Sequence, residues 1–302
     1  MRAAPIFLPS PSSPLPDRIG LLAGWGRYPV VIAEALRARG CRVYCLGVRG
    51  HADPVLQSLC YDFQPLGIAK LGQAMRYFRR HGVAQATMAG KIHKVLIFRR
   101  WYWLKHLPDF RFLRTFYPHF ITGSRDRKDD TLLGTIVRAF AAEGIAFHPA
   151  TDFAPELLVE YGMICGRGIG HRESQDIEFG WQLAAEMGRL DVGQSVAVKG
   201  RAVLAVEAVE GTDECIRRAG QLCPAGGFTV VKIAKPQQDM RFDVPTIGLG
   251  TVQTMAAAGG RVLAIEADKT ILLDRAEIVE FAQRRGISIV AVRNGNARPF
   301  IR

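Results

Sequence analysis

The stretch "RIGLLAGWGRYPVVIAEALRARGCRVYCLGV", residues 18–48, decides the fold of the first half of the chain. It begins with an apolar run, turns at glycines, continues with apolar residues at helical spacing as far as Gly40, and ends in a second apolar run. These periodicities predict a strand, a loop, a helix and a second strand. The stretch therefore predicts a β-loop-α-β unit.

The loop after the first predicted strand contains Gly24, Trp25 and Gly26. Glycines let the backbone turn sharply, and the helix that follows offers N–H groups to an anion. The spacing is not G-x-G-x-x-G, because Pro29 stands where a third glycine would be needed. The loop thus predicts a ligand-binding turn without the fingerprint of a dinucleotide site.

A third predicted strand, residues 85–90, also ends in glycine, and Lys91 follows it. Open α/β sheets bind ligands at the carboxyl ends of their strands, where Gly90 and Lys91 would lie. We therefore expect residues 17–152 to form a Rossmann-like domain of alternating strands and helices. Residues 1–16, rich in Pro and Ser, are interpreted as a disordered leader rather than a signal peptide.

Residues 153–302 predict a second, mixed α/β domain, since a chain of 302 residues is long enough for two domains. The pattern favours a helix over 174–191 and a strand over 227–235, and the apolar run after Pro245 reads as a buried strand. Two such domains usually bind a ligand in the cleft between them, and we expect a cleft there.

Polar residues cluster at the ends of the strands predicted in the second domain. The clusters are Glu207 and Glu210 with Thr212 and Asp213, Lys232 with Lys235, the segment Asp239 to Asp243, and Glu266 with Asp268. Lysine neutralises phosphate charge, and carboxylates hold Mg²⁺, which polarises a phosphoryl oxygen. The clusters suit a phosphorylated substrate and a divalent cation. Each has a structural alternative: surface charges for the glutamates and lysines, a helix N-cap for Asp213, and a turn acid for Asp243.

Asp243 is followed by Val244 and Pro245. Proline restricts the residue before it to extended backbone, so the sequence predicts a rigid bend after the acid. A carboxylate on a rigid bend is well suited to catalysis.

The formal net charge of +12 favours an anionic partner, whether nucleic acid, an anionic membrane surface or a phosphorylated small molecule. A basic surface with no such partner is the alternative. Residues 91–117 interleave basic and aromatic side chains, which is typical of contact with lipid or single-stranded nucleic acid. Two short helices with aromatic core residues would give the same composition. No C-x-x-C pair occurs among the six cysteines, so we expect a reduced, cytoplasmic protein.

Several motifs, in this order and spacing, are similar to those of the LpxI family. They are "IGLLAGWGRYPVVIAEAL" from residue 19, "RGHADPVL" from 49, "KDDTLL" from 128, "LDVGQ" from 190, "AVEAVEGTD" from 205 and "DVPTIG" from 243. The resemblance runs from about residue 18 to 292, and the motifs of the second half are its specific part. Members of this family are UDP-2,3-diacylglucosamine pyrophosphatases of lipid A biosynthesis.

The resemblance implies an enzyme in which water attacks the α-phosphorus of UDP-2,3-diacylglucosamine. The products would be UMP and 2,3-diacylglucosamine 1-phosphate, known as lipid X, and Mg²⁺ would be required. Asp243 would be the essential carboxylate, acting as metal ligand or as general base. A homodimer on or near the cytoplasmic face of the inner membrane is also implied.

The residues expected to bind this substrate come from both domains. They are Gly24, Trp25, Gly26, Gly90, Lys91, Lys128, Asp129, Glu207, Thr212, Asp213, Lys232 and Lys235. The two lysines of the second domain are the candidates for phosphate contact. The glycine loops of the first domain are candidates for the uridine or the glucosamine.

Two other classes of protein fit the sequence less well. A nucleotide-sugar-binding or NAD-dependent Rossmann protein should carry an acid about 20 residues after the glycines to bind ribose, but Arg49 and His51 occur there and Asp53 lies beyond the strand. A nucleic-acid binder should show a recognisable binding fold, and no such motif is present in the sequence. The sequence therefore favours the hydrolase.

Overall fold

The computed structural model describes residues 15–91, 107–121, 129–241 and 244–301. They form two compact units, which we call the N-terminal unit, up to Pro155 together with Met240 and Arg241, and the C-terminal unit, from Glu156 onward. The division falls three residues after the border predicted at 152. Lys128, Asp243, most of the 91–117 segment and most of the predicted leader lie outside the described residues.

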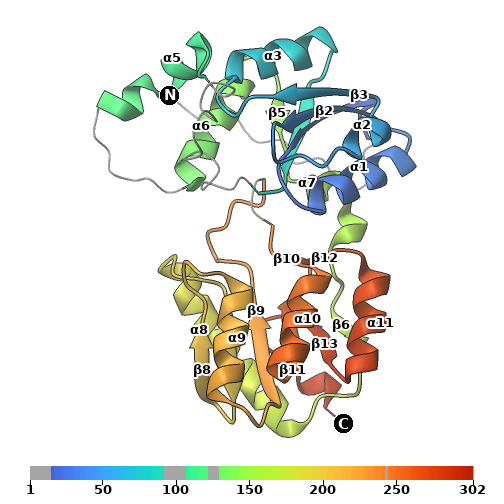
Figure 1. Ribbon diagram of the computed structural model, residues 1–302, viewed down its shortest axis with the longest axis vertical. Coiled ribbons are helices and arrows are strands. Elements are labelled where there is room, and N and C mark those ends of the chain that lie inside the picture. Colours follow the sequence, from blue (N-terminus) through green and yellow to red (C-terminus); the bar gives the residue numbers. More distant parts are fainter. Residues whose placement is uncertain (1–14, 92–106, 122–128, 242–243, 302) are drawn as a thin grey trace. The chain divides into compact units, whose positions relative to one another are not determined.

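The N-terminal unit is built on a parallel five-stranded sheet with the order β3-β2-β1-β4-β5 (Figure 1). Its strands are β1 (Arg18–Ala23), β2 (Arg42–Val48), β3 (Asp62–Leu66), β4 (Gln85–Ala89) and β5 (Ala146–Phe147). The strand order reverses direction between β1 and β4. The predicted Rossmann-like arrangement is confirmed, and β1 is its central strand because the first two crossovers lie on one side of it and the later ones on the other.

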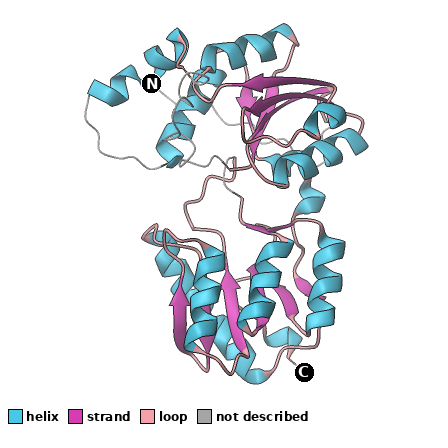
Figure 2. Ribbon diagram, in the orientation of Figure 1, coloured by secondary structure: helices cyan, strands magenta, loops and turns pink. Residues whose placement is uncertain are grey.

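Helices cover both faces of this sheet (Figure 2). They are α1 (Tyr28–Ala38), α2 (Leu56–Leu59), α3 (Leu71–Arg80), α5 (Phe110–Ile121), α6 (Asp129–Ala141) and α7 (Ala150–Phe153). On one face, Met75 and Phe78 of α3 and Phe140 of α6 pack with Leu46 of β2 in one hydrophobic cluster. Burial of these apolar side chains is the main favourable term that fixes the helices to the sheet.

The C-terminal unit contains a six-stranded mixed sheet with the order β6-β13-β11-β9-β7-β8. Its strands are β6 (Gly162–Cys165), β7 (Ser195–Lys199), β8 (Ala202–Val206), β9 (Phe228–Lys232), β11 (Gly260–Glu266) and β13 (Ser288–Val292). The central strands β9, β11 and β13 are parallel, and β6, β7 and β8 pair antiparallel at the two sides. The predicted mixed α/β domain is confirmed.

One long helix covers one face of this sheet and three shorter helices cover the other. The long helix is α8 (His171–Arg189), and the others are α9 (Thr212–Leu222), α10 (Leu249–Ala258) and α11 (Arg275–Arg285), with short 3-10 turns η2 (Pro155–Leu157) and η3 (Arg298–Phe300). Gly180 allows α8 to approach the sheet closely, because a Cβ there would lie 2.8 Å from Cγ2 of Val231. No helix in the described part of the chain is both long and apolar enough to cross a bilayer.

The buried strand expected after Pro245 was a wrong prediction. Only Thr246–Ile247 form a strand, β10, which pairs with β12 (Ile271–Leu272), and helix α10 follows. A short apolar run is compatible with a buried strand or a buried helix, and periodicity alone does not separate them. Gly248 in extended backbone starts α10, and Gly259 at φ 83° ends it.

Candidate functional site

The two glycine loops of the N-terminal unit lie side by side at the carboxyl edge of its sheet. Gly24 donates a backbone hydrogen bond to Ala89 over 2.8 Å, and Trp25 and Lys91 exchange two backbone hydrogen bonds of 2.7 and 2.9 Å. The loops follow β1 and β4, where the strand order reverses, which is the usual ligand position in such sheets. The structure therefore brings Gly24, Trp25, Gly90 and Lys91 together, with Trp25 half exposed.

Gly90 is required by this close approach. Its φ of +91° lies in the left-handed region that favours glycine, and a Cβ would lie 2.8 Å from Cγ of Pro29 and from the carbonyl oxygen of Trp25. Any larger residue would separate the two loops. The glycine thus fixes the position of the Lys91 backbone relative to the loop after β1.

Two residues that the sequence did not single out, His148 and Asp152, lie elsewhere in this unit. His148 follows β5, and its Nε2 atom is buried without a hydrogen-bond partner among the described residues. Burial lowers the pKa of His148, and the positive charge of Arg241 lowers it further. Burial raises the pKa of Asp152, while His148 acts in the opposite direction. No spacing or motif marks these groups, because the fold alone brings them together.

In the C-terminal unit, buried polar side chains meet at the carboxyl end of β9. The ammonium group of Lys232 donates hydrogen bonds to Oγ1 of Thr212 and to the carbonyl oxygen of Thr246, each over 3.2 Å. Thr212 donates to Oε1 of Glu207 over 3.1 Å, and Ser195 lies 3.3 Å from the same hydroxyl. We call Ser195, Glu207, Thr212, Lys232 and the carbonyl group of Thr246 the Lys232 cluster.

The pairing of the strands brings the side chains of the Lys232 cluster together. Ser195 begins β7 and pairs with Lys232 at the end of β9, because those strands are antiparallel. Glu207 directly follows β8, and its backbone N–H donates to the carbonyl oxygen of Ser195 over 2.9 Å. Thr212 is the first residue of α9. The cluster therefore rests on regular strands and a helix terminus rather than on a loose loop.

The hydrogen-bond directions in the cluster follow from the number of protons. Thr212 has one hydroxyl proton, which it donates to Glu207, so its oxygen accepts from Lys232 and from Ser195. Lys232 is 7 % exposed and Glu207 is 8 % exposed, so the pair holds two opposite charges away from water, bridged by one hydroxyl. Oε2 of Glu207 is buried and has no partner among the described residues. One carboxylate oxygen thus remains available to a ligand.

The other candidate residues of the C-terminal unit form contacts outside the Lys232 cluster. Asp213 accepts a hydrogen bond of 2.9 Å from Thr251, which ties α9 to α10. Lys235 forms an ion pair of 2.7 Å with Asp191. Lys232 and Lys235 therefore have different partners, because the chain leaves β9 after Lys232 and turns Lys235 toward Asp191, which follows α8.

The remaining acids of the predicted clusters form local contacts. Glu210 pairs with Arg218, and Glu266 pairs with Lys269 and accepts from the backbone N–H of Ala234. Asp129 begins α6, and its side chain is outside what the structure describes. Within the described ranges, no group of three or more His, Cys, Asp or Glu side chains is arranged to hold a metal ion.

Sequence reasoning missed two members of the Lys232 cluster. Ser195 is fully buried, and nothing in its neighbourhood in the sequence marks it. The carbonyl group of Thr246 carries no sequence signal at all. Knowledge of the β7–β9 register was needed to find Ser195.

Comparisons with known proteins agree with this two-part construction. The family model described as "LpxI N-terminal domain" matches residues 18–157, and that described as "LpxI C-terminal domain" matches residues 160–290. A protein of Caulobacter vibrioides named "UDP-2,3-diacylglucosamine pyrophosphatase LpxI" is 31 % identical over 282 residues, which cover 91 % of this chain and 97 % of that protein.

Proposed function

Since the chain belongs to the LpxI family, we propose that it hydrolyses the pyrophosphate bond of UDP-2,3-diacylglucosamine. The similarity to the Caulobacter enzyme extends over both units rather than over one of them. The structural observation that carries the proposal is the Lys232 cluster, a buried lysine held in one position at the end of a central strand.

Lys232 is the proposed phosphate ligand. Hydrolysis of a phosphoanhydride builds negative charge on the leaving phosphate, and a fixed cation in a water-poor site stabilises that charge strongly. Thr212 and the carbonyl group of Thr246 hold the ammonium group, so it need not reorganise during the reaction. Lys235, paired with Asp191 at a more exposed position, is the weaker candidate for a phosphate contact.

Asp243 is the proposed essential carboxylate, on the strength of the "DVPTIG" motif. It stands three residues before Thr246, whose carbonyl oxygen accepts a hydrogen bond from Lys232. Its proposed role is to activate the attacking water as general base or to hold the metal ion.

Mg²⁺ is the proposed cofactor. It usually binds through one or two carboxylates together with phosphate oxygens of the substrate, so a cage of several acids is not required. Oε2 of Glu207, buried without a partner among the described residues, fits as one such ligand, and Asp243 is the second. When bound, Mg²⁺ would neutralise phosphate charge and polarise a phosphoryl oxygen.

The loops of the N-terminal unit are proposed to hold the uridine or the glucosamine. The half-exposed indole of Trp25 offers a flat surface on which a ring can stack, and Lys91 lies beside it through paired backbone hydrogen bonds. The cleft between domains, the homodimer, and the roles of Lys128 and Asp129 stay predictions.

Hydrolysis in ¹⁸O-labelled water tests the reaction and its regiochemistry. We expect release of UMP and 2,3-diacylglucosamine 1-phosphate, with the label in UMP because water attacks the α-phosphorus. Label in the lipid phosphate would contradict attack at that atom. Binding of the nucleotide sugar without any product would favour the nucleotide-sugar-binding alternative.

A further inference from the structure

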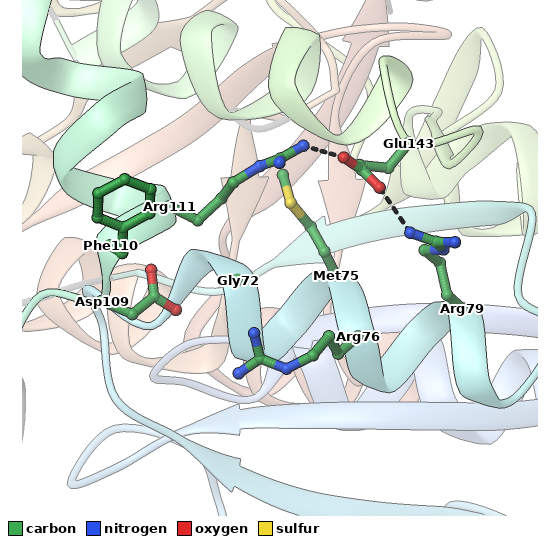
Figure 3. Close-up of a pocket in the computed structure, with 8 residues that line it drawn as sticks. All are labelled: Gly72, Met75, Arg76, Arg79, Asp109, Phe110, Arg111 and Glu143. Carbon is green, nitrogen blue, oxygen red and sulfur yellow. Dashed lines mark hydrogen bonds and ion pairs between the residues drawn. The ribbon is translucent and has the colours of Figure 1, made fainter.

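A pocket of about 260 Å³ opens between α3 and α5 in the N-terminal unit (Figure 3). Two arginines of α3, Arg76 and Arg79, and one of α5, Arg111, line it together with Asp109 and Glu143. Three guanidinium groups and two carboxylates leave the pocket with a surplus of positive charge.

Both carboxylates are already engaged by the protein. Glu143 pairs with Arg79 over 2.9 Å and also with Arg111, and Figure 3 shows it between these two arginines. Asp109 accepts backbone hydrogen bonds from Gln73 and Phe112, which fixes the start of α5. Arg76 has no hydrogen bond or ion pair with any described residue. One guanidinium group therefore remains for an anionic ligand.

Gly72 keeps the pocket open. A Cβ at this position would lie 3.0 Å from Oδ2 of Asp109 and from Cβ of Arg111, and 3.4 Å from Nη1 of Arg76. A side chain would thus enter the space that these groups enclose. The pocket therefore depends on a residue that has no side chain.

Large exposed apolar side chains occur at and next to this charged pocket: Phe110 lines it, and Leu107 and Leu113 lie three residues to either side of Phe110 in the chain. Phe110 and Leu113 of α5 are 78 % and 50 % exposed, and Leu107, which precedes this helix, is 43 % exposed, whereas Phe116 of α5 is buried in the core. An aromatic ring this exposed forgoes the free energy of burial that a core position would give it. Exposed aromatic and aliphatic side chains together with arginines are typical of protein segments that bind in the membrane interface.

We propose that this corner of the N-terminal unit docks on an anionic lipid bilayer. Arg76 binds a lipid phosphate in the α3–α5 pocket, and Phe110 and Leu113 enter the interfacial region beside it. Charge complementarity favours an anionic surface, and the exposed apolar side chains favour lipid over nucleic acid. This goes beyond the proposed hydrolysis and does not depend on it, because vesicle binding is measured without substrate.

Flotation of the full chain with lipid vesicles tests the proposal. We expect binding to vesicles of phosphatidylcholine with about one third phosphatidylglycerol, and much weaker binding to phosphatidylcholine alone, since each basic residue near an anionic surface contributes measurably. Arg76→Ala should lower the partition coefficient about fivefold. Phe110→Ser should lower it by a similar factor, because the ring no longer enters the interface.

Arg37→Ala is the matched control. Arg37 lies on α1 of the same unit and is exposed, so this variant loses the same charge away from the pocket. Arg76→Ala and Phe110→Ser should keep the wild-type melting temperature. Equal partition of wild type and both variants, or an equal loss in Arg37→Ala, would overturn the proposal. So would binding to an RNA oligonucleotide that depends on Arg76 while no vesicle binding occurs.

Discussion

The ammonium nitrogen of Lys232 lies 3.2 Å from the hydroxyl oxygen of Thr212, and that hydroxyl donates in turn to Glu207. The hydroxyl thus joins a buried cation to a buried anion. Removal of a bridge between buried charges leaves both incompletely bonded, which costs more than the bond itself contributes. The proposed activity should therefore depend on a residue that need not touch the reacting phosphate.

Thr212→Val is the first test of this dependence. The variant keeps the shape of threonine and loses the hydroxyl, so Lys232 and Glu207 lose their shared partner. We expect kcat/KM for UMP release to fall about tenfold to hundredfold, because an unsatisfied buried polar group costs roughly 1–3 kcal/mol. Thr212→Ser restores the hydroxyl and should recover most of the activity. Equal activity of the valine and serine variants would exclude a role for the bridge.

Lys232→Met removes the proposed phosphate ligand at similar volume. We expect kcat to fall by a factor of about 10²–10³, the size of effect seen when one charge-stabilising group is lost from an active site. Lys269→Met is the control, since Lys269 is half exposed and pairs with Glu266 rather than with the Lys232 cluster. Steady-state kinetics of both variants check this. A wild-type rate from folded Lys232→Met would remove Lys232 from the chemistry.

Gly90→Ala should destabilise the N-terminal unit. The backbone at φ +91° disfavours alanine, and the added Cβ would meet Pro29 and the Trp25 carbonyl oxygen at 2.8 Å. Gly40→Ala is the matched control, because Gly40 also has a positive φ, of +79°, but its Cβ would meet nothing within 4 Å. Urea unfolding should show a larger loss for Gly90→Ala, by about 1 kcal/mol or more. Equal losses would mean that backbone conformation alone makes the glycine necessary.

The stability of the N-terminal unit should depend on pH through His148. Because burial lowers the pKa of His148 below its ordinary value of 6.5, the unfolded chain binds a proton more readily than the folded one. The free energy of unfolding should therefore rise as pH rises from the lowered pKa to about 6.5. Asp152 acts oppositely and at lower pH, since its raised pKa makes the folded state bind protons more readily just above 3.8.

His148→Gln separates these two contributions. We expect the variant to show a smaller increase in the free energy of unfolding as the pH rises toward 6.5, with no new dependence above it. Urea denaturation at a series of pH values measures this directly. An unchanged pH profile would show that His148 is not the responsible group.

A structural role of Asp213 can be distinguished from a role in substrate binding. Its hydrogen bond to Thr251 predicts that Asp213→Ala and Thr251→Val destabilise the C-terminal unit non-additively. A double-mutant cycle from urea unfolding should give a coupling of about 0.5–1.5 kcal/mol. Loss of kcat in Asp213→Ala but not in Thr251→Val would instead support the predicted role in substrate binding.

The sequence was most informative where the apolar periodicity and the turn residues predict the same helices and strands. Residues 18–48 predicted a strand, a glycine loop, a helix and a strand, and the structure has β1, α1 and β2 there. The sequence also predicted glycine loops at the carboxyl ends of two strands, and in the structure Trp25 and Lys91 of these loops are hydrogen-bonded to each other. In a β-loop-α-β unit, residues close in the sequence are also neighbours in the fold, so the local sequence pattern predicts the structure well.

Contacts between distant side chains were less accessible from the sequence. Lys232 and Lys235 are close in the chain, yet β9 ends between them, so Lys232 bonds to Thr212 and Lys235 pairs with Asp191. Ser195 enters the cluster through the antiparallel β7–β9 register, which sequence patterns do not specify. The helix α10 was mistaken for a strand because a buried apolar run is compatible with either.

The most direct test of the central claim is UMP release from UDP-2,3-diacylglucosamine by wild type and Asp243→Asn, with Mg²⁺ or with EDTA. Asp239→Asn is the matched control, since it removes a neighbouring carboxylate of the same segment. The account predicts Mg²⁺-dependent UMP release by wild type and Asp239→Asn, and its loss in Asp243→Asn. UMP release by Asp243→Asn at the wild-type rate, or none from folded wild type, would contradict it.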